Sequence, residues 1–138
     1  AMDGASKFVK GDAIAGVMSP DDRASVFLAM GRASAEANLE GPKRPFVREG
    51  DPHFLLRNVP RMYASQHSAG TRTYEQTGAR SAVVRTLEGE EPDAEDCLTA
   101  IGWLRRALEL SGGRAATVEE TQCRARGGTC CEYVCKWA

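Results

Sequence analysis

The second half of the chain has a pattern that few folds can satisfy, because one helical segment lies between two pairs of strand-like segments. The first pair, residues 71–77 and 80–87, is rich in Thr, Val and Tyr around Gly78, which is typical of a β-hairpin. The second pair, residues 115–126 and 130–137, is joined by a Gly-Gly turn. This ββαββ order predicts an antiparallel sheet.

The segment between the two hairpins is the clearest helix in the sequence. Pro92 and the acidic residues after it favour a helix start, and Gly112-Gly113 favours a helix end. Its apolar side chains recur at helical spacing, so we expect one face to contain Ala94, Cys97, Ile101, Leu104 and Leu108.

The first half of the chain is expected to be mainly helical. Ser19 is predicted to be the N-cap of a helix that runs from Pro20 to Gly41. The apolar face of that helix is predicted to contain Val26, Phe27, Met30, Ala33 and Ala37. A helical turn is predicted at Asp51-Pro52, and a second start after Asn58. Shorter elements are predicted at residues 7–10 and 12–18. The fold class is therefore α+β, with N-terminal helices packed on a twisted antiparallel sheet.

The length of 138 residues predicts one domain. Ala1 and Met2 are typical of a cloning remnant, so the native chain is expected to begin or continue elsewhere. We expect residues 3–138 to form a single domain of the ligand-binding type. Within it, residues 3–70 are mainly helical and residues 71–138 form the ββαββ unit.

Composition excludes several classes of partner. A formal net charge of -1 disfavours nucleic acid, and apolar runs of only a few residues predict no membrane span. No charged start precedes an apolar stretch, so no secretory signal is expected. Five cysteines is an odd number, which favours a reduced, cytoplasmic protein over a disulfide-bonded secreted one.

Four of the five cysteines lie within residues 123–135. Strand side chains alternate between the two faces of a sheet. This alternation predicts an inner face that contains Cys123, Cys131, Tyr133, Cys135 and Trp137. Cys130 would then point the opposite way, which makes it the predicted exposed thiol.

Four interpretations of these cysteines remain open. The favoured one is that free thiols fill the core between sheet and helix. A metal site is a weaker alternative, with Cys123, Cys131, Cys135 and His67 as candidate ligands, because the spacings lack paired CxxC motifs. A reactive thiol requires a lowered pKa and exposure. A disulfide is the fourth alternative, and Cys123 with Cys131 is its easiest pairing.

The motifs "CLTAIGWLRRALELSGGR" and "VEETQCRARGGTCCEYVCKW" resemble the C-terminal half of 4-vinyl-reductase-type domains, which are hydrocarbon-binding or small-molecule-binding domains. That family is related in fold to haem-NO-binding domains and to Bet3-like tethering subunits. The segments "FVKGDAI" and "RNVPRMYASQHSAGTRTYEQTG" also resemble a myxobacterial paralogous family. The resemblance implies a bacterial regulatory domain, often dimeric, with a pocket between helices and sheet.

The resemblance does not extend to a haem site. Haem-NO-binding relatives use an axial His and a Y-x-S-x-R motif, whereas this chain has only "YASQH", from Tyr63 to His67, without the Arg. His53 and His67 are the two histidines that an axial role would require. No haem ligand carries over, and no cofactor is expected.

We expect a non-enzymatic regulatory domain, since two histidines and no nucleophile motif give no catalytic residues. It would bind a small, largely apolar ligand and couple it to a homodimer or a regulatory protein partner. The alternative is an interaction or dimerisation module without a ligand, and a zinc or haem protein is a third possibility. The candidate pocket residues are Phe54, Tyr63, Trp103, Cys123, Cys131, Tyr133, Cys135 and Trp137.

Overall fold

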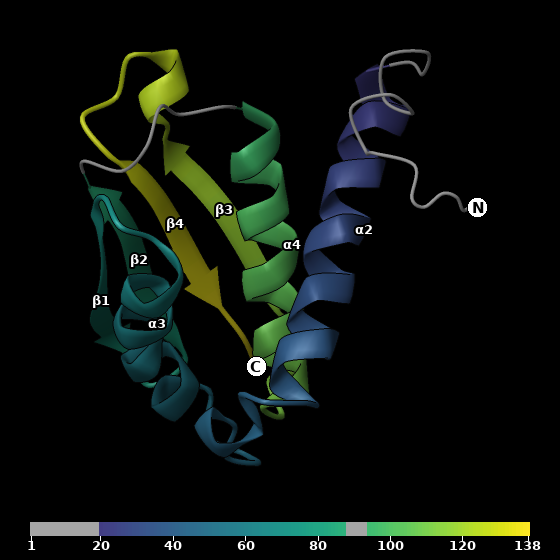
Figure 1. Ribbon diagram of the computed structural model, residues 1–138. Helices are drawn as coiled ribbons and strands as arrows, with labels where there is room; N and C mark the ends of the chain where they lie inside the picture. Colours follow the sequence, from purple (N-terminus) through teal and green to yellow (C-terminus); the bar gives the residue numbers. More distant parts are fainter. Residues whose placement is uncertain (1–19, 88–93) are drawn as a thin grey trace.

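The computed structural model describes residues 20–87 and 94–138 and confirms the α+β class (Figure 1). Its elements are α2 (Pro20–Leu39), η1 (Arg44–Phe46), α3 (Pro52–Gln66), β1 (Thr71–Gly78), β2 (Ser81–Leu87), α4 (Ala94–Leu110), β3 (Thr117–Gln122), η2 (Arg124–Arg126) and β4 (Cys131–Lys136). Both predicted hairpins and the helix between them are present, but the strand predicted over residues 115–126 is shorter, because β3 ends at Gln122 and residues 124–126 form the η2 turn. The predictions for residues 7–10 and 12–18, the Ser19 cap and the Pro92 start lie outside the described residues.

The four strands form one antiparallel sheet in the order β1-β2-β4-β3. The helices α3 and α4 cover one face of this sheet, and α2 packs on the outer side of α4 (Figure 1). The core lies between these helices and the sheet, and its fully buried large side chains include Leu55, Leu56, Val84, Leu104, Leu108, Tyr133 and Cys135. The opposite face of the sheet is polar, since Arg85 pairs there with Glu75 and Glu132.

The buried face of α2 differs from the prediction. Met30, Ala33 and Ala37 are exposed, and the buried positions are Phe27, Gly31, Ala35 and Leu39. The reason is a close approach of two helix backbones: a Cβ atom on Gly31 would lie 2.0 Å from the Thr99 carbonyl oxygen, and one on Gly102 would lie 2.2 Å from the Leu28 carbonyl oxygen. A contact made by glycine and alanine leaves the larger Met30 outside.

Helix α3 begins as predicted, because the Asp51 carboxylate caps it by accepting a hydrogen bond from the Phe54 amide. The predicted second start is wrong. The helix continues through Pro60, and the Asn58 amide donates a hydrogen bond to the Phe54 carbonyl instead of capping a new helix. A proline inside a helix removes one backbone donor without ending the helix when tertiary packing holds both sides. Val59 and Met62 supply that packing in the core.

The last hairpin contains an irregularity that matters for the site. The β3–β4 register pairs Glu120 with Tyr133 and Gln122 with Glu132, so one residue of β3 is left over as a bulge. Glu120 therefore lies on the inner face, where regular alternation from Cys123 would have turned it outward. Across the described residues, no helix combines the length and apolarity needed to cross a membrane.

Candidate ligand cavity and metal centre

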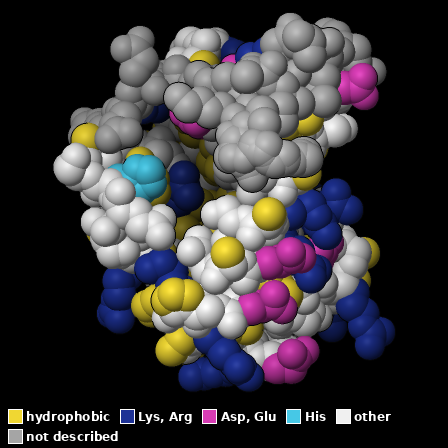
Figure 2. All heavy atoms as spheres, turned by 45° about the vertical axis from the view of Figure 1, so that its right-hand side comes forward, with side chains coloured by type: hydrophobic (Ala, Val, Ile, Leu, Met, Phe, Trp, Pro, Cys, Tyr) yellow, Lys and Arg dark blue, Asp and Glu magenta, His cyan; other side chains and the backbone are white. Residues whose placement is uncertain are grey.

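A cavity of about 420 Å³ lies between the inner face of the sheet and the helices. All three long helices and three of the four strands contribute to it. Its lining residues are Ser34, Asn38, Val59, Met62, Tyr63, Gln66, His67, Arg72, Thr86, Asp96, Cys97, Thr99, Ala100, Trp103, Arg124, Cys131 and Tyr133, with Arg124 coming from the η2 turn rather than a strand. Its volume is in the range of small-molecule sites in proteins. Figure 2 shows a hollow on one face of the molecule where apolar and basic side chains lie near a histidine.

The cavity surface is mainly apolar, although nine of its seventeen lining residues are polar or charged. Val59 and Met62 of α3 face Ala100 and Trp103 of α4 across it. Tyr133 lies on the sheet side, and burial raises the pKa of its phenol, which stays neutral. Such a surface suits a ligand that is mainly apolar and has one or two polar atoms.

Four of the eight predicted pocket residues line this cavity: Tyr63, Trp103, Cys131 and Tyr133. The other four lie elsewhere. Cys135 is fully buried in the core, and Trp137 packs against that core and against the His53 ring. The Phe54 ring lies under the Arg48 guanidinium, with its centre 3.9 Å from the Arg48 Cζ atom. Cys123 belongs to the thiol cluster described next.

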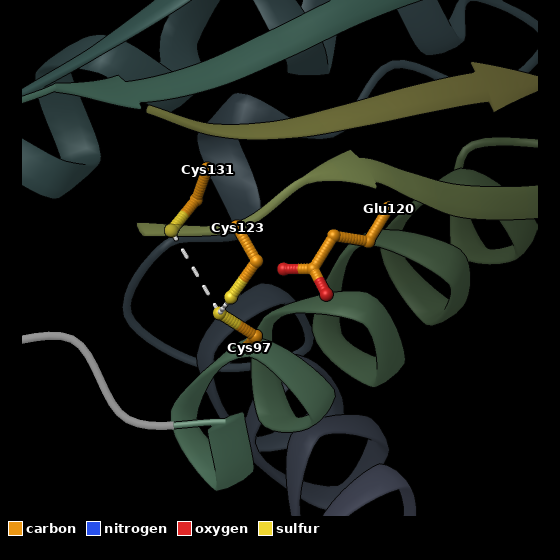
Figure 3. Close-up of side chains that lie close together, drawn as sticks. All are labelled: Cys97, Glu120, Cys123 and Cys131. Carbon is orange, nitrogen blue, oxygen red and sulfur yellow. Dashed lines mark hydrogen bonds between the residues drawn. The ribbon is translucent and has the colours of Figure 1, made fainter. Parts of the chain in front are cut away.

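Three cysteines and one glutamate meet beside the cavity (Figure 3). Cys97 extends from the first turns of α4, Glu120 from β3, Cys123 from the residue after β3, and Cys131 from the start of β4. Their thiol sulfurs and one carboxylate oxygen all lie within 4.8 Å of one another. The Sγ–Sγ distances are 3.5 Å from Cys97 to Cys123 and 3.8 Å from Cys97 to Cys131, too long for a disulfide bond.

Two sulfur–sulfur distances in this cluster match those around a tetrahedral metal ion. Sulfur ligands about 2.3 Å from a zinc ion lie about 3.8 Å from one another, close to the two distances observed. The cluster also has the turn expected beside such a site, because the Arg124 amide donates a hydrogen bond to Cys131 Sγ over 3.5 Å. Cysteine sulfur and carboxylate oxygen are both donors that zinc binds in proteins.

One polar atom of the cluster has no partner among the described residues. The Glu120 side chain is 7% exposed, and its Oε1 atom pairs with the exposed Arg126 guanidinium over 3.3 Å, whereas this unpartnered atom is its Oε2. Burial raises the pKa of the Cys97 thiol, and the nearby Glu120 carboxylate raises it further. A divalent cation would reverse both effects, because it neutralises the carboxylate and favours the thiolates.

The structure assembles a different metal-ligand set from the one considered in the sequence. Cys123 and Cys131 are in the cluster, whereas Cys135 and His67 lie outside it. Cys97 and Glu120 complete the set. The Glu120-x-x-Cys123 spacing, followed by a turn and Cys131, is the signal that was available. Regular strand alternation predicts that Glu120 and Cys123 lie on opposite faces of the sheet. The bulge in β3 instead brings Glu120 to the inner face.

The prediction that Cys130 is exposed is wrong, since the structure buries it to 5% exposure. Strand β4 begins at Cys131, so alternation does not extend to Cys130. Its thiol lies 3.9 Å from the Gln122 side-chain oxygen. All five cysteines of the chain are buried and free.

The two histidines do not form a haem pocket. Both ring nitrogens of His53 are occupied, because Nε2 bonds the carbonyls of Gly78 and Ala79 and Nδ1 bonds the Tyr74 hydroxyl. His67 is exposed at the rim of the cavity, where its ring stacks on Tyr63. Neither imidazole extends into the apolar interior as an axial ligand would.

Several solved structures have a similar fold. The phenol-responsive sensory domain of the transcription activator PoxR, solved with phenol, is 12% identical and has a TM-score of 0.66, with 95% of this chain and 76% of that domain covered. The H-NOX domain of Shewanella oneidensis in its Fe(II)CO state is 13% identical and has a TM-score of 0.65. An H-NOX protein from K. algicida is 11% identical and has a TM-score of 0.59, with 92% of this chain and 67% of that protein covered.

At these identities the likeness is one of fold. The match to the Shewanella domain covers 84% of this chain and 65% of that domain, so the chain spans just under two thirds of its length. No curated protein matches the sequence at a significant level. One family matches residues 29–138. The chain therefore belongs to the family described as protein of unknown function DUF2378.

Proposed function

We propose that this chain is a non-enzymatic sensory domain that binds a small, largely apolar ligand between helices α3 and α4 and the sheet. The observation that carries this proposal is the cavity of about 420 Å³, whose surface is mainly apolar and also carries polar side chains. The fold supports it, because the PoxR domain of the same fold is described as a phenol-responsive sensory domain. Binding would stabilise one arrangement of the helices and so bias a dimer or a partner contact.

Ligand binding can be tested by filling the cavity. Ala100→Trp places an indole in the cavity, whereas Ala33→Trp places the same group on the exposed side of α2. We expect native mass spectrometry of the purified full chain to detect a co-purifying small molecule. Phenol and related compounds should raise the melting temperature of the wild type and of the Ala33→Trp variant, but not that of Ala100→Trp.

The rival function is an interaction module whose cavity has no ligand. It predicts an empty protein by native mass spectrometry, a tight oligomer, and no thermal shift with any small apolar compound. Those three results together would contradict the proposed ligand sensor and support a dimerisation domain.

We also propose that Cys97, Glu120, Cys123 and Cys131 bind one zinc ion, because their donor atoms lie within 4.8 Å of one another and two sulfur–sulfur distances match tetrahedral coordination. Four protein ligands leave no open coordination position, which is typical of a structural rather than a catalytic zinc. The ion would join the start of α4 to the β3–β4 turn. Elemental analysis of the protein purified without chelator tests this, and a metal-free protein that does not take up zinc would contradict it.

A further inference from the structure

Arg72 occupies an unusual position for a guanidinium group. It lies on the inner face of β1, where its cross-strand partner is Thr86, and both residues line the cavity. Its Nε atom donates a hydrogen bond of 2.9 Å to the Thr86 hydroxyl. Its Cζ atom lies 4.5 Å from the centre of the Tyr63 ring. These two contacts hold the plane of the guanidinium in place and leave its two terminal nitrogens for other partners.

No carboxylate in residues 20–87 or 94–138 forms an ion pair with Arg72. The contrast with two other partly buried arginines is clear. Glu75 and Glu132 flank Arg85, and Glu36 and Glu109 flank Arg106. Those carboxylates raise the pKa of both arginines, whereas burial lowers the pKa of Arg72. A desolvated cation without an anion is costly, so the cavity favours a negatively charged occupant.

The other charged groups around the cavity do not remove this preference. The cavity lining contains two arginines, Arg72 and Arg124, and one aspartate, Asp96. Asp96 and Arg124 each have an interaction partner already. The remaining lining near Arg72 contains no carboxylate: it consists of the Tyr63 and Tyr133 rings, the Thr86 hydroxyl and the Cys131 side chain.

We propose that the ligand is a small organic acid, whose carboxylate binds the terminal nitrogens of Arg72 and whose apolar part lies between Met62, Ala100 and Trp103. The planar guanidinium suits a carboxylate, because the two groups form paired, charge-assisted hydrogen bonds. The inference rests on the proposed function, since it names the chemistry of the ligand for the same cavity.

The test compares acids with their neutral amides on the full chain. Benzoate and benzamide form an aromatic pair, and hexanoate and hexanamide an aliphatic pair. By calorimetry at neutral pH, at least one acid should bind about tenfold or more tightly than its amide, which is the discrimination expected for one charge-assisted contact. Which pair shows the larger ratio distinguishes an aromatic from an aliphatic skeleton.

Substitutions assign the preference to Arg72. Arg72→Met should remove the discrimination between acid and amide, because the charge is lost. The amide should still bind, because the methionine side chain keeps the unbranched apolar part of the arginine. Arg72→Lys should keep a smaller preference, since it retains the charge and loses the paired geometry. Arg61→Met is the matched control, because Arg61 is exposed on α3 and does not line the cavity. It should leave both affinities unchanged.

Two results would overturn the inference in distinguishable ways. If wild-type protein binds amides or phenol as tightly as acids, the ligand is neutral and the proposed sensory function stands without the anion. If neither acids, amides nor phenol bind, the proposed function itself fails and the inference fails with it. The acid-to-amide ratio is measured on the wild type, so it does not depend on the folding of any variant.

Discussion

The Sγ atoms of Cys97 and Cys123 lie 3.5 Å apart, although one belongs to helix α4 and the other follows strand β3. Cys131 lies 3.8 Å from the same Cys97 sulfur. The three thiols therefore tie a helix start, a turn and a strand start together at one point of the core. The predictions below test what this point binds and how the surrounding fold supports it.

Replacing Cys97 by Ser should abolish stoichiometric zinc binding, because it removes a thiolate from a closed four-ligand site. We expect zinc-loaded wild type to be more stable than the variant by at least about 2 kcal/mol, measured by urea unfolding. Cys135→Ser is the control, since Cys135 is equally buried but lies outside the cluster. It should lower stability and keep its zinc. Equal metal content in all three proteins would contradict the site.

Replacing Glu120 by Gln should weaken zinc binding by at least about tenfold in a chelator competition, because an amide oxygen is a poorer zinc ligand than a carboxylate. The metal-free variant should be as stable as the metal-free wild type or more so, since the substitution removes a buried charge. Glu119→Gln, one residue away and exposed, should change neither quantity. Unchanged zinc affinity in Glu120→Gln would remove the carboxylate from the ligand set.

Replacing Gly31 by Ala should force α2 and α4 apart, because the added methyl group would lie 2.0 Å from the Thr99 carbonyl oxygen. We expect a loss of about 3 kcal/mol in the free energy of unfolding, at the upper end of the range for overpacked sites. Met30→Ala, at a neighbouring position of 43% exposure, should change it by less than about 0.5 kcal/mol. If both variants unfold at the same denaturant concentration, the close helix contact is absent.

Glu132 should make a small, pH-dependent contribution to stability. A hydrogen bond from Thr121 and the Arg85 guanidinium lower the pKa of the Glu132 carboxyl. Its stabilisation is therefore present above the unfolded-state pKa of about 4.3 and disappears as the pH falls through the lower folded-state pKa. The Glu132 side chain is 17% exposed and that of Arg85 is 34% exposed, so solvent screens the pair in part and wild type should exceed Glu132→Gln by no more than about 1 kcal/mol at pH 7. The difference in stability between the two proteins should shrink steadily as the pH is lowered from 5, and a difference that does not change with pH would exclude this titration as the cause.

The regular parts of the fold were predictable because their patterns have a fixed period. Alternation predicted both hairpins, and helical spacing predicted α4, whose Cys97, Leu104 and Leu108 are buried as expected. The buried face of α2 was not predictable, since Gly31 makes a backbone contact that no hydrophobic pattern encodes. Pro60 predicted a break that tertiary packing overrides.

The site was only partly predictable. Aromatic and thiol side chains of the last strand pointed to the right face of the sheet, and Cys131 and Tyr133 do line the cavity. Glu120 was missed because one bulged residue shifts the alternation of β3. Cys97 was assigned to the apolar face of its helix, but which thiols it meets depends on how α4 lies across the sheet. Arg72 was one arginine among many in the sequence, and only its burial without a carboxylate distinguishes it.

Because all five cysteines are buried, the rates at which their thiols are alkylated report local opening of the structure. A thiol with at most 6% exposure reacts with an alkylating reagent only when the structure around it opens transiently. Five buried thiols in three different places therefore give five labelling rates, each a measure of the free energy of opening at its position. Metal binding would slow labelling at Cys97, Cys123 and Cys131 together. Cys130 and Cys135, which depend on packing alone, would keep their own rates and so separate the stability of the fold from the occupancy of the cluster.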